Sequence, residues 1–238
     1  MSDLVVLHGA LGSAHQFEPL RALLPDVRLH ILEFHGHGAA AEIDAPWTID
    51  LFADQLQTYL QSIRADLLSD LLPDLLSDLP VLGYSMGGYV ALRLAQRDSS
   101  ISRILTLGSK LDWSPDGAAK EIKMLDADVI EAKVPAFAAD LQRRHGADRW
   151  RTVLAKTADM MIGLGNDPVL TEGDMAKISI PVRYGLGDRD EMVTLDETAR
   201  FYRATPGAEL VVLPGTRHPI EKVRPHLLVE QIRSFLLT

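Results

Sequence analysis

The stretch Gly83-Tyr84-Ser85-Met86-Gly87 places a serine between two glycines, after a short apolar run, Val81–Tyr84, and before a helical pattern. A serine on a sharp strand-to-helix turn needs glycine two residues to either side, because side chains there would collide. Such a turn exposes the hydroxyl at the edge of a sheet and directs a helix N-terminus toward it, which favours developing negative charge. Ser85 is therefore the candidate nucleophile. The alternative interpretation is a glycine-rich loop without a chemical role.

A serine hydroxyl is a weak nucleophile at neutral pH, so it needs a neutral imidazole within hydrogen-bond reach. The chain has eight histidines. His218 follows the apolar run Leu210–Leu213 and precedes the last helical pattern, which puts it at the same sheet edge as Ser85. His8 and His37 lie near that edge too, and we expect them to hydrogen-bond to loop backbone. His218 is the candidate base.

Two acids, Asp188 and Asp190, compete to orient that histidine, and both follow the apolar run Val182–Leu186. Asp190 stands nine residues after Pro181 and three before Val193, so it falls on the loop after the strand has ended. We favour Asp190 as the triad acid and interpret Asp188 as a solvated loop acid or turn former.

Acyl-transfer chemistry also needs two donors for an oxyanion, and backbone amides near the serine are the usual source. The amide of Met86, directly after Ser85, is one candidate. The loop His8–Ser13, which follows the first apolar run, supplies the second through the amide of Ala10 or Leu11.

The elements that must position these residues alternate along the chain. Apolar runs typical of buried parallel strands are separated by amphipathic stretches, which predicts an α/β fold with a mostly parallel sheet of about six strands and helices on both faces. The expected strands are Leu4–Leu7, Val27–Leu32, Val81–Tyr84, Ile101–Leu107, Val182–Leu186 and Leu210–Leu213. The expected helices are His15–Leu24, Ile49–Leu68, Met86–Gln96, Thr194–Ala204 and Glu221–Leu236.

Residues 111–177 break this rhythm, with roughly four helical patterns and no convincing strand. We predict a helical cap inserted into a core of residues 1–110 and 178–238. Among its apolar residues, Trp113, Trp150, Met160 and Met161 are candidates for a substrate-pocket wall. The alternative is that they form the core of the insertion itself.

A four-residue repeat of leucines and acids spans Asp66–Pro80. It predicts a lengthened helix-to-strand connection, with a kink or restart at Pro73.

Composition narrows the function further. With 24 basic and 33 acidic residues the 238-residue chain has a formal charge of −9, which disfavours nucleic-acid binding. It has no cysteine, so thiolate catalysis and disulfides are excluded. No apolar stretch is long enough to span a membrane, and the start of the chain does not resemble a signal peptide, so we expect a cytoplasmic protein. No motif suggests a metal or organic cofactor, and we expect a small-molecule substrate. The sequence leaves the oligomeric state open.

Taken together, these motifs resemble those of the α/β-hydrolase superfamily from Leu4 to Leu236. The His-Gly-x-x-Gly start, the serine turn, the Gly-x-x-Asp-x-x-Val loop at Gly187–Val193 and the histidine loop follow in the order of that family. Two departures stand out: the chain begins on the first strand, and Glu33 replaces a usual aspartate. The resemblance implies a serine hydrolase with a helical cap, similar to esterases and lipases.

Three functions are compatible with this resemblance. The first is hydrolysis of a small to medium, partly apolar carboxylic ester, thioester or lactone. The second uses the same triad for C–C bond hydrolysis or for lyase chemistry of the menaquinone-pathway type; a basic pocket would favour it, and Lys110, Arg143, Arg144, Arg149 and Arg151 are candidates for one. The third is a non-enzymatic ligand receptor on the same scaffold.

Overall fold

A computed structural model describes residues 2–70, 78–98 and 100–238. Six parallel strands form one sheet in the order β2-β1-β3-β4-β5-β6, which confirms the predicted α/β class and strand number. Each observed strand contains the apolar run that predicted it. The strands are β1 (Ser2–Leu7), β2 (Val27–Leu32), β3 (Leu79–Tyr84), β4 (Ile101–Leu107), β5 (Val182–Gly187) and β6 (Glu209–Leu213).

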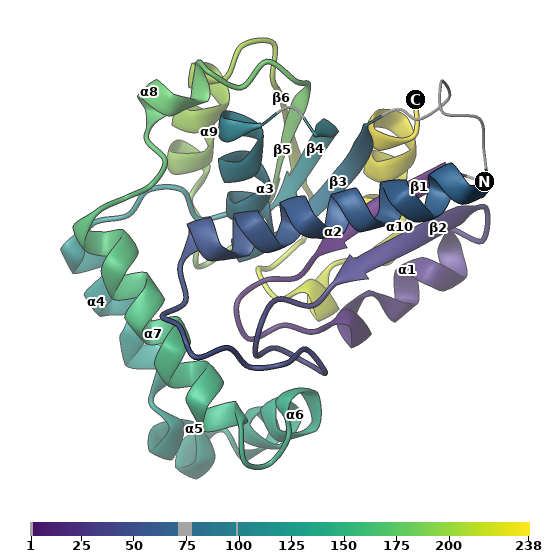
Figure 1. Ribbon diagram of the computed structural model, residues 1–238. Helices are drawn as coiled ribbons and strands as arrows, with labels where there is room; N and C mark the ends of the chain where they lie inside the picture. The colour runs from purple at the N-terminus through teal and green to yellow at the C-terminus, as the bar shows by residue number, and fades with distance from the viewer. Residues whose placement is uncertain (1, 71–77, 99) are drawn as a thin grey trace.

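Helices cover both faces of this sheet (Figure 1). Alternate residues of β1 enter different cores: Val5 and Leu7 pack with α2 (Ile49–Asp70) and α3 (Met86–Arg97). Leu4 and Val6 instead pack with residues of α1 (Glu18–Leu23) and α10 (Pro225–Gln231). Because both faces are buried, the strands are apolar throughout, as parallel sheets require. α9 (Leu195–Ala204) adds Phe201 to the first of these cores.

Two expected helices are interrupted, and in each a proline stands in the first turn of the α-helix that follows a 3₁₀ turn. The stretch His15–Leu24 forms a 3₁₀ turn, Ala14–Phe17, followed by α1, which has Pro19 in its first turn. The stretch Glu221–Leu236 forms a 3₁₀ turn at Ile220–Lys222, then α10, then a π-helical turn, Ile232–Leu236. Pro225 begins α10 because proline lacks an amide hydrogen and fits only the first helical turn. The single long helix predicted at the C-terminal end is therefore wrong.

The acidic leucine repeat is described only in part. α2 continues through Asp66 to Asp70, as the repeat predicts. The kink or restart predicted at Pro73 lies outside the described residues.

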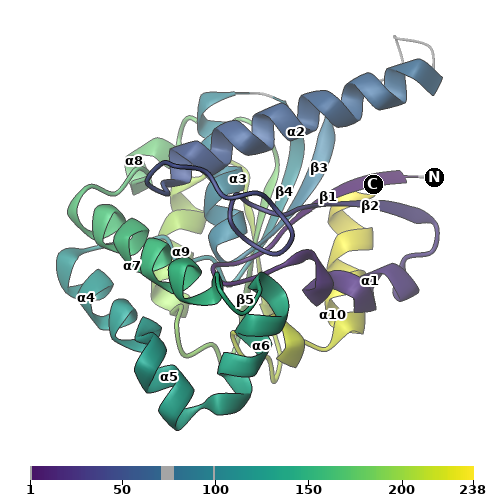
Figure 2. The ribbon, with the colours of Figure 1, turned by 60° about the horizontal axis from the view of Figure 1, so that its bottom comes forward.

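Between β4 and β5 the chain forms five α-helices, one more than the sequence suggested. They are α4 (Pro115–Ile122), α5 (Ala127–Lys133), α6 (Pro135–His145), α7 (Trp150–Asn166) and α8 (Glu172–Met175). Figures 1 and 2 show α4 to α7 gathered beyond the carboxyl ends of the strands. Buried side chains of α5, α6 and α7 belong to the same apolar cluster as α2 and α3, so the insertion and the sheet share one continuous core.

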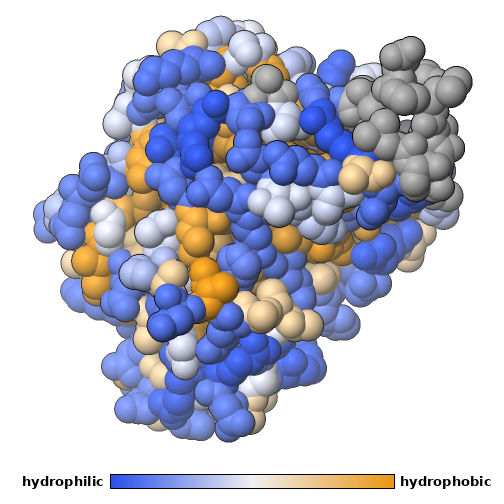
Figure 3. All heavy atoms as spheres, in the orientation of Figure 1, coloured by the Kyte–Doolittle hydropathy of each residue, from blue (hydrophilic) through white to orange (hydrophobic). Residues whose placement is uncertain are grey.

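The surface in the view of Figure 3 is mostly hydrophilic, and its apolar side chains gather in small patches, mainly where α4 and α7 lie. Among the helices that the structure describes, none combines the length and the apolar character needed to cross a bilayer.

Candidate active site

Ser85 lies between β3 and α3 in a strained backbone conformation, with φ 51° and ψ −118°. A non-glycine residue at positive φ is uncommon and is held there by its surroundings. The Ser85 amide donates to the Leu107 carbonyl oxygen at 2.8 Å, and the Ser109 hydroxyl donates to the Ser85 carbonyl oxygen at 2.9 Å. A Cβ atom at Gly87 would lie 2.6 Å from the Leu7 Cβ, so this turn packs closely against the end of β1.

Asp190 and His218 form a buried pair on the loops that follow β5 and β6. The His218 Nδ1 donates to the Asp190 Oδ2 at 2.8 Å, and the two side chains are 10% and 2% exposed, in the order His218 and Asp190. The other carboxylate oxygen, Oδ1, accepts from the amides of Met192 and Val193, each at 2.9 Å. The bond to Nδ1 leaves the opposite ring nitrogen, Nε2, without a proton in the neutral imidazole.

Two further contacts hold His218 in place. The Tyr84 hydroxyl donates to the His218 carbonyl oxygen at 3.0 Å, which links the serine turn to the histidine loop. Gly108, which has φ 61°, packs directly against the Asp190–His218 pair. A Cβ atom at Gly108 would lie 3.0 Å from the Asp190 Oδ2 and 3.2 Å from the His218 Nδ1. Only a glycine fits this position without displacing the pair.

Asp188 has a different environment from Asp190. Its Oδ1 accepts from the Thr216 amide at 3.0 Å, so it joins the two loops without contacting the imidazole. Hydrogen bonds from the backbone of Gly215 and Thr216 lower the pKa of the Asp188 carboxyl. Of the two acids that the sequence left in competition, the geometry places Asp190 beside His218.

The loop after β1 supplies amides next to Ser85. The Gly12 amide donates to the Gly9 carbonyl oxygen at 3.0 Å, which closes a turn in which Leu11 adopts φ 59°. A Cβ at Gly9 would lie 3.0 Å from the Ser85 Cβ. Within the described part of the chain, the amides of Ala10, Leu11 and Met86 donate to no protein acceptor. They remain able to bind a negatively charged oxygen.

A residue of the helical insertion hydrogen-bonds to the loop after β1. His145, the last residue of α6, accepts from the Gly38 amide on Nδ1 at 3.0 Å and donates from Nε2 to the Leu11 carbonyl oxygen at 3.1 Å. Glu33, which stands where the related family has an aspartate, accepts from the amides of Ala14 and Ala39, each at 2.9 Å. The replacement therefore keeps a contact between the two loops.

The other histidines near this edge are bound to backbone, as the sequence predicted. His8 donates from Nδ1 to the Gly9 carbonyl oxygen at 2.7 Å and accepts from the Phe34 amide on Nε2 at 3.1 Å. Burial lowers the pKa of His8 to about 4. The Nδ1 of His37 lies 3.1 Å from the His35 carbonyl oxygen, and burial lowers the pKa of His37 well below its usual range. Across the described ranges, no three histidine or carboxylate side chains are grouped so that they could hold a metal ion.

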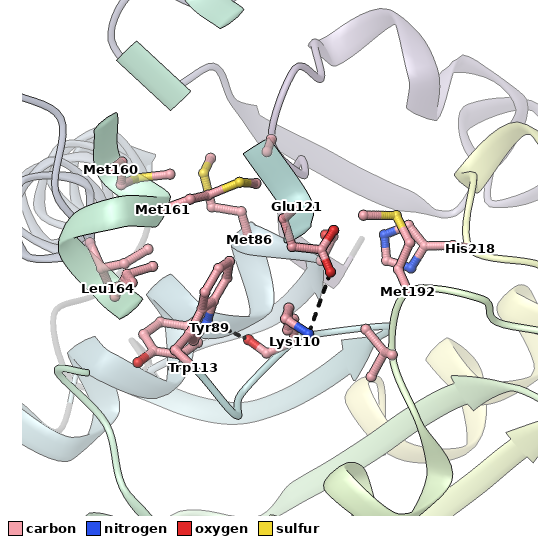
Figure 4. Close-up of a pocket in the computed structure, with 14 residues that line it drawn as sticks. Met86, Tyr89, Lys110, Trp113, Glu121, Met160, Met161, Leu164, Met192 and His218 are labelled. Atoms are coloured by element: carbon pink, nitrogen blue, oxygen red, sulfur yellow. Dashed lines mark hydrogen bonds and ion pairs between the residues drawn. The ribbon is translucent and has the colours of Figure 1, made fainter. Parts of the chain in front are cut away.

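Two cavities meet at Ser85 and His218. The inner cavity has a volume of about 40 Å³, and the outer groove has a volume of about 910 Å³. Both are lined by Ala10, Ser85, Met161, Met192 and His218. The serine and the histidine therefore lie at the boundary between a small space and a wide one. Figure 4 shows the inner cavity, with α7 on one side and His218 and Met192 on the other.

Three of the four predicted wall residues line the inner cavity: Trp113, Met160 and Met161. Trp150 does not line either cavity. It is 2% exposed inside the shared core, and the Arg151 guanidinium lies 4.8 Å above its ring. The prediction that Trp150 forms part of the pocket wall is therefore wrong. From the first turn of α7 its side chain packs into the core and does not face Ser85.

Several wall residues were missed in the sequence. Glu121, Tyr89, Leu164 and Met192 also line the inner cavity. Met192 directly precedes Val193 in the loop that carries Asp190, so its position in the sequence could have indicated that it lies beside the site. Glu121 follows from no motif, because it is one acid among many on amphipathic helices.

The candidate basic residues do not combine into a basic pocket. Lys110 lines the inner cavity, where its Nζ lies 3.6 Å from the Glu121 Oε1. Arg143 and Arg144 line the outer groove, and both pair with Asp140, while Arg144 also pairs with Glu221 at 2.6 Å. Arg149 and Arg151 line neither cavity: Arg149 donates to the carbonyl oxygens of Gly38 and Ala40. Arg151 pairs with Asp128 and Glu131.

Comparison with known proteins agrees with this architecture. A family model described as "Alpha/beta hydrolase family" matches residues 4–231. The chain is 24% identical to the 2-succinyl-6-hydroxy-2,4-cyclohexadiene-1-carboxylate synthase of Yersinia pseudotuberculosis over 255 residues, which covers 98% of this chain and 86% of that one. It is 22% identical to the 2-(acetamidomethylene)succinate hydrolase of Mesorhizobium japonicum over 259 residues, covering 98% and 87%. The crystal structure of an enol-lactonase from Burkholderia xenovorans superposes with a TM-score of 0.75 at 18% identity, covering 100% of this chain and 92% of that one.

Proposed function

Since the chain belongs to the alpha/beta hydrolase family and is an enzyme of the hydrolase type, we propose that it hydrolyses carboxylic esters, thioesters or lactones through an acyl-enzyme on Ser85. The observation that carries this proposal is the buried Asp190–His218 hydrogen bond of 2.8 Å beside a cavity that Ser85 also lines. A serine, an oriented imidazole and a buried carboxylate are the groups that acyl transfer needs.

In the proposed mechanism, the His218 Nε2 accepts the Ser85 proton as the hydroxyl attacks the ester carbonyl carbon. Asp190 fixes the tautomer of the imidazole and stabilises the imidazolium that forms. The negative oxygen of the tetrahedral intermediate binds the amides of Met86 and of Ala10 or Leu11, which have no protein acceptor in the described chain. His218 then protonates the departing alcohol, and water, activated by the same imidazole, releases the acid.

The cavities favour a substrate of small to medium size. The inner cavity of about 40 Å³ has room for a short group only. The outer groove of about 910 Å³ accepts a larger portion. Met86, Met160, Met161, Leu164 and Met192 line the inner space, so most of its wall is apolar.

We further propose that residues 111–177 act as a cap over this site. Trp113, Glu121 of α4 and three residues of α7 line the cavity that contains Ser85. Ser85 is partly buried rather than open to solvent. Specificity would then come from the cap, while the core holds the triad.

Lyase chemistry is the second candidate, since one relative is named a 2-succinyl-6-hydroxy-2,4-cyclohexadiene-1-carboxylate synthase. A carboxylate-bearing substrate of that kind needs a cationic pocket. Lys110, which lines the inner cavity, is paired with Glu121. Because the charges of Lys110 and Glu121 nearly balance, the inner cavity favours hydrolysis of a substrate without a carboxylate over lyase chemistry on a carboxylate-bearing one.

The test is a series of p-nitrophenyl esters of graded acyl length together with a fluorophosphonate probe. We expect turnover with a maximum at short to medium chains, and covalent labelling of Ser85. An enzyme that releases no p-nitrophenol from any member, and whose serine remains unlabelled, would contradict the proposal.

A further inference from the structure

The inner cavity contains a charged pair that the proposed triad does not use. The Lys110 Nζ lies 3.6 Å from the Glu121 Oε1, and both side chains line the space that contains Ser85 and His218. In Figure 4 the Glu121 carboxylate and the Lys110 ammonium point toward each other, with Trp113 on one side of the pair and Met192 and His218 on the other. The Nζ also lies 5.7 Å above the Trp113 ring.

This pair is poorly suited to a purely structural role. The Glu121 side chain is only 8% exposed, and its Oε2 atom has no hydrogen-bond partner within the described chain. A buried ion pair offsets its desolvation only when further hydrogen bonds satisfy the remaining lone pairs. At 3.6 Å the pair is also longer than a direct hydrogen bond. A carboxylate with one unsatisfied oxygen and an ammonium that makes no direct hydrogen bond to it therefore line the same small cavity.

The opposite charges of Lys110 and Glu121 determine which ligand group could hydrogen-bond to both side chains. A carboxylate that approached Lys110 would be repelled by Glu121, and a cation that approached Glu121 would be repelled by Lys110. A neutral amide has a donor and an acceptor side by side. Its N–H can bind the Glu121 carboxylate while its carbonyl oxygen binds the Lys110 Nζ, and no net charge enters the apolar cavity.

We propose that Lys110 and Glu121 form a specificity subsite for a small neutral amide group on the substrate portion that enters the inner cavity. This inference rests on the proposed ester hydrolysis and names the chemical class of its substrate. The cavity volume of about 40 Å³ limits that group to the size of a carboxamide or a short N-acyl group.

The experiment compares kcat/KM for short phenyl esters that end in a carboxamide, a carboxylate, a trimethylammonium or an isopropyl group. Two series are made, with the terminal group on the acyl chain in one and on the alcohol in the other. In one of the two, the wild-type enzyme should prefer the carboxamide to the similarly shaped isopropyl group by about tenfold or more, since the amide satisfies two polar groups.

The variants should change the order of preference in opposite directions. Glu121→Gln leaves Lys110 unpaired and should favour the carboxylate ester, whereas Lys110→Met leaves Glu121 unpaired and should favour the trimethylammonium ester. Lys177→Met is the matched control: it removes an ion pair with Asp174 in the same insertion, and Lys177 does not line either cavity. It should retain the wild-type order.

The outcomes separate the two proposals. An enzyme that hydrolyses the isopropyl esters but shows the same order of preference in wild type and both pocket variants overturns the subsite and leaves the proposed hydrolase function intact. The subsite is overturned as well if the wild type prefers the carboxylate in both series. Absence of turnover with every ester, together with an unlabelled Ser85, counts against the proposed function itself.

Discussion

The carboxylate of Asp190 binds the imidazole of His218 with one oxygen and the backbone of its own loop with the other. Oδ2 accepts from the His218 Nδ1 at 2.8 Å, while Oδ1 accepts from the amides of Met192 and Val193 at 2.9 Å. The acid is therefore fixed by its loop as well as by the base that it orients. Asp188, two residues earlier, binds the Thr216 amide on the neighbouring loop and does not reach the imidazole.

Replacing Asp190 by asparagine should lower kcat by about a thousandfold or more. The His218 imidazole is then no longer held in the tautomer that leaves Nε2 free to accept a proton, and the imidazolium that forms has no negative partner. Asp188→Asn is the matched control and should change kcat by less than about tenfold, since it affects only a loop contact. Steady-state kinetics on a p-nitrophenyl ester measure both. A larger loss from Asp188→Asn would transfer the role of triad acid to that residue.

Ser85→Ala should abolish turnover and prevent fluorophosphonate labelling without reducing stability. The Ser85 side chain has no hydrogen bond to other described residues, so its removal leaves no buried group unpaired. Thermal unfolding should give a Tm within about 2 °C of the wild type, as expected for a change below about 0.5 kcal/mol. Residual activity comparable with the wild type would mean that another residue is the nucleophile.

Gly108→Ala should disrupt the acid–histidine pair as well as the backbone. Its positive φ of 61° costs a Cβ-bearing residue about 1 kcal/mol, and the new methyl group would press on the Asp190 Oδ2 and the His218 Nδ1. Gly207→Ala is a matched control, because Gly207 has φ 65° and no described atom beyond its chain neighbours would lie within 4 Å of the new methyl group.

Both alanine variants should lose similar stability from backbone strain, and only Gly108→Ala should also lose most of its kcat. Calorimetry and ester kinetics on the two proteins give the comparison. Equal kcat values would show that the close approach of Gly108 to the pair has no effect on catalysis.

Met161 lies at the boundary of both cavities, so its size should set how far a substrate reaches between them. Met161→Ala should shift the preference toward esters with longer acyl chains. For a chain that is longer by one or two methylenes, kcat/KM should rise about tenfold, because relieving the steric misfit of one methylene in a pocket contributes ~1–3 kcal/mol. Ile162→Ala, at the adjacent position of α7, is the control, because Ile162 is exposed and lines neither cavity. An unchanged chain-length profile in Met161→Ala would argue against a cap that selects substrates.

Stability should fall on acidification through the region in which buried histidines must gain a proton. Burial lowers the pKa of His8 from 6.5 to about 4, so between these pH values the unfolded chain binds the proton and the folded chain does not. The stabilisation is complete above pH 6.5 and is lost as the pH falls toward 4, by about 3 kcal/mol for this group.

Urea unfolding measured at several pH values between 4 and 7 tests this expectation. His8→Gln keeps a polar side chain and should reduce the slope of unfolding free energy against pH, whereas His226→Gln, on the last helix and away from the buried histidines, should leave it unchanged. A His8→Gln slope equal to that of the wild type would show that His8 does not contribute to acid sensitivity.

Local patterns in the amino-acid sequence were sufficient to predict the sheet and the order of the candidate site residues along the chain. Apolar runs bounded by glycine and proline mark strands locally, and the paired glycines around Ser85 are required by the steric limits of one turn. Because the carboxyl ends of parallel strands share an edge, the positions of Ser85, Asp190 and His218 after three such runs predict that they lie at one edge of the sheet.

Side chains with similar local patterns could be distinguished only after the packing of the whole chain was known. Asp188 and Asp190 differ in which loop atoms they reach, and Trp150 and Met161 lie on one amphipathic helix but face the core and the cavity, respectively. The approach of Glu121 to Lys110 joins residues eleven positions apart across a turn and a helix, and no local periodicity encodes that contact. Such relationships depend on how whole elements pack, which is a property of the complete fold and not of a window of sequence.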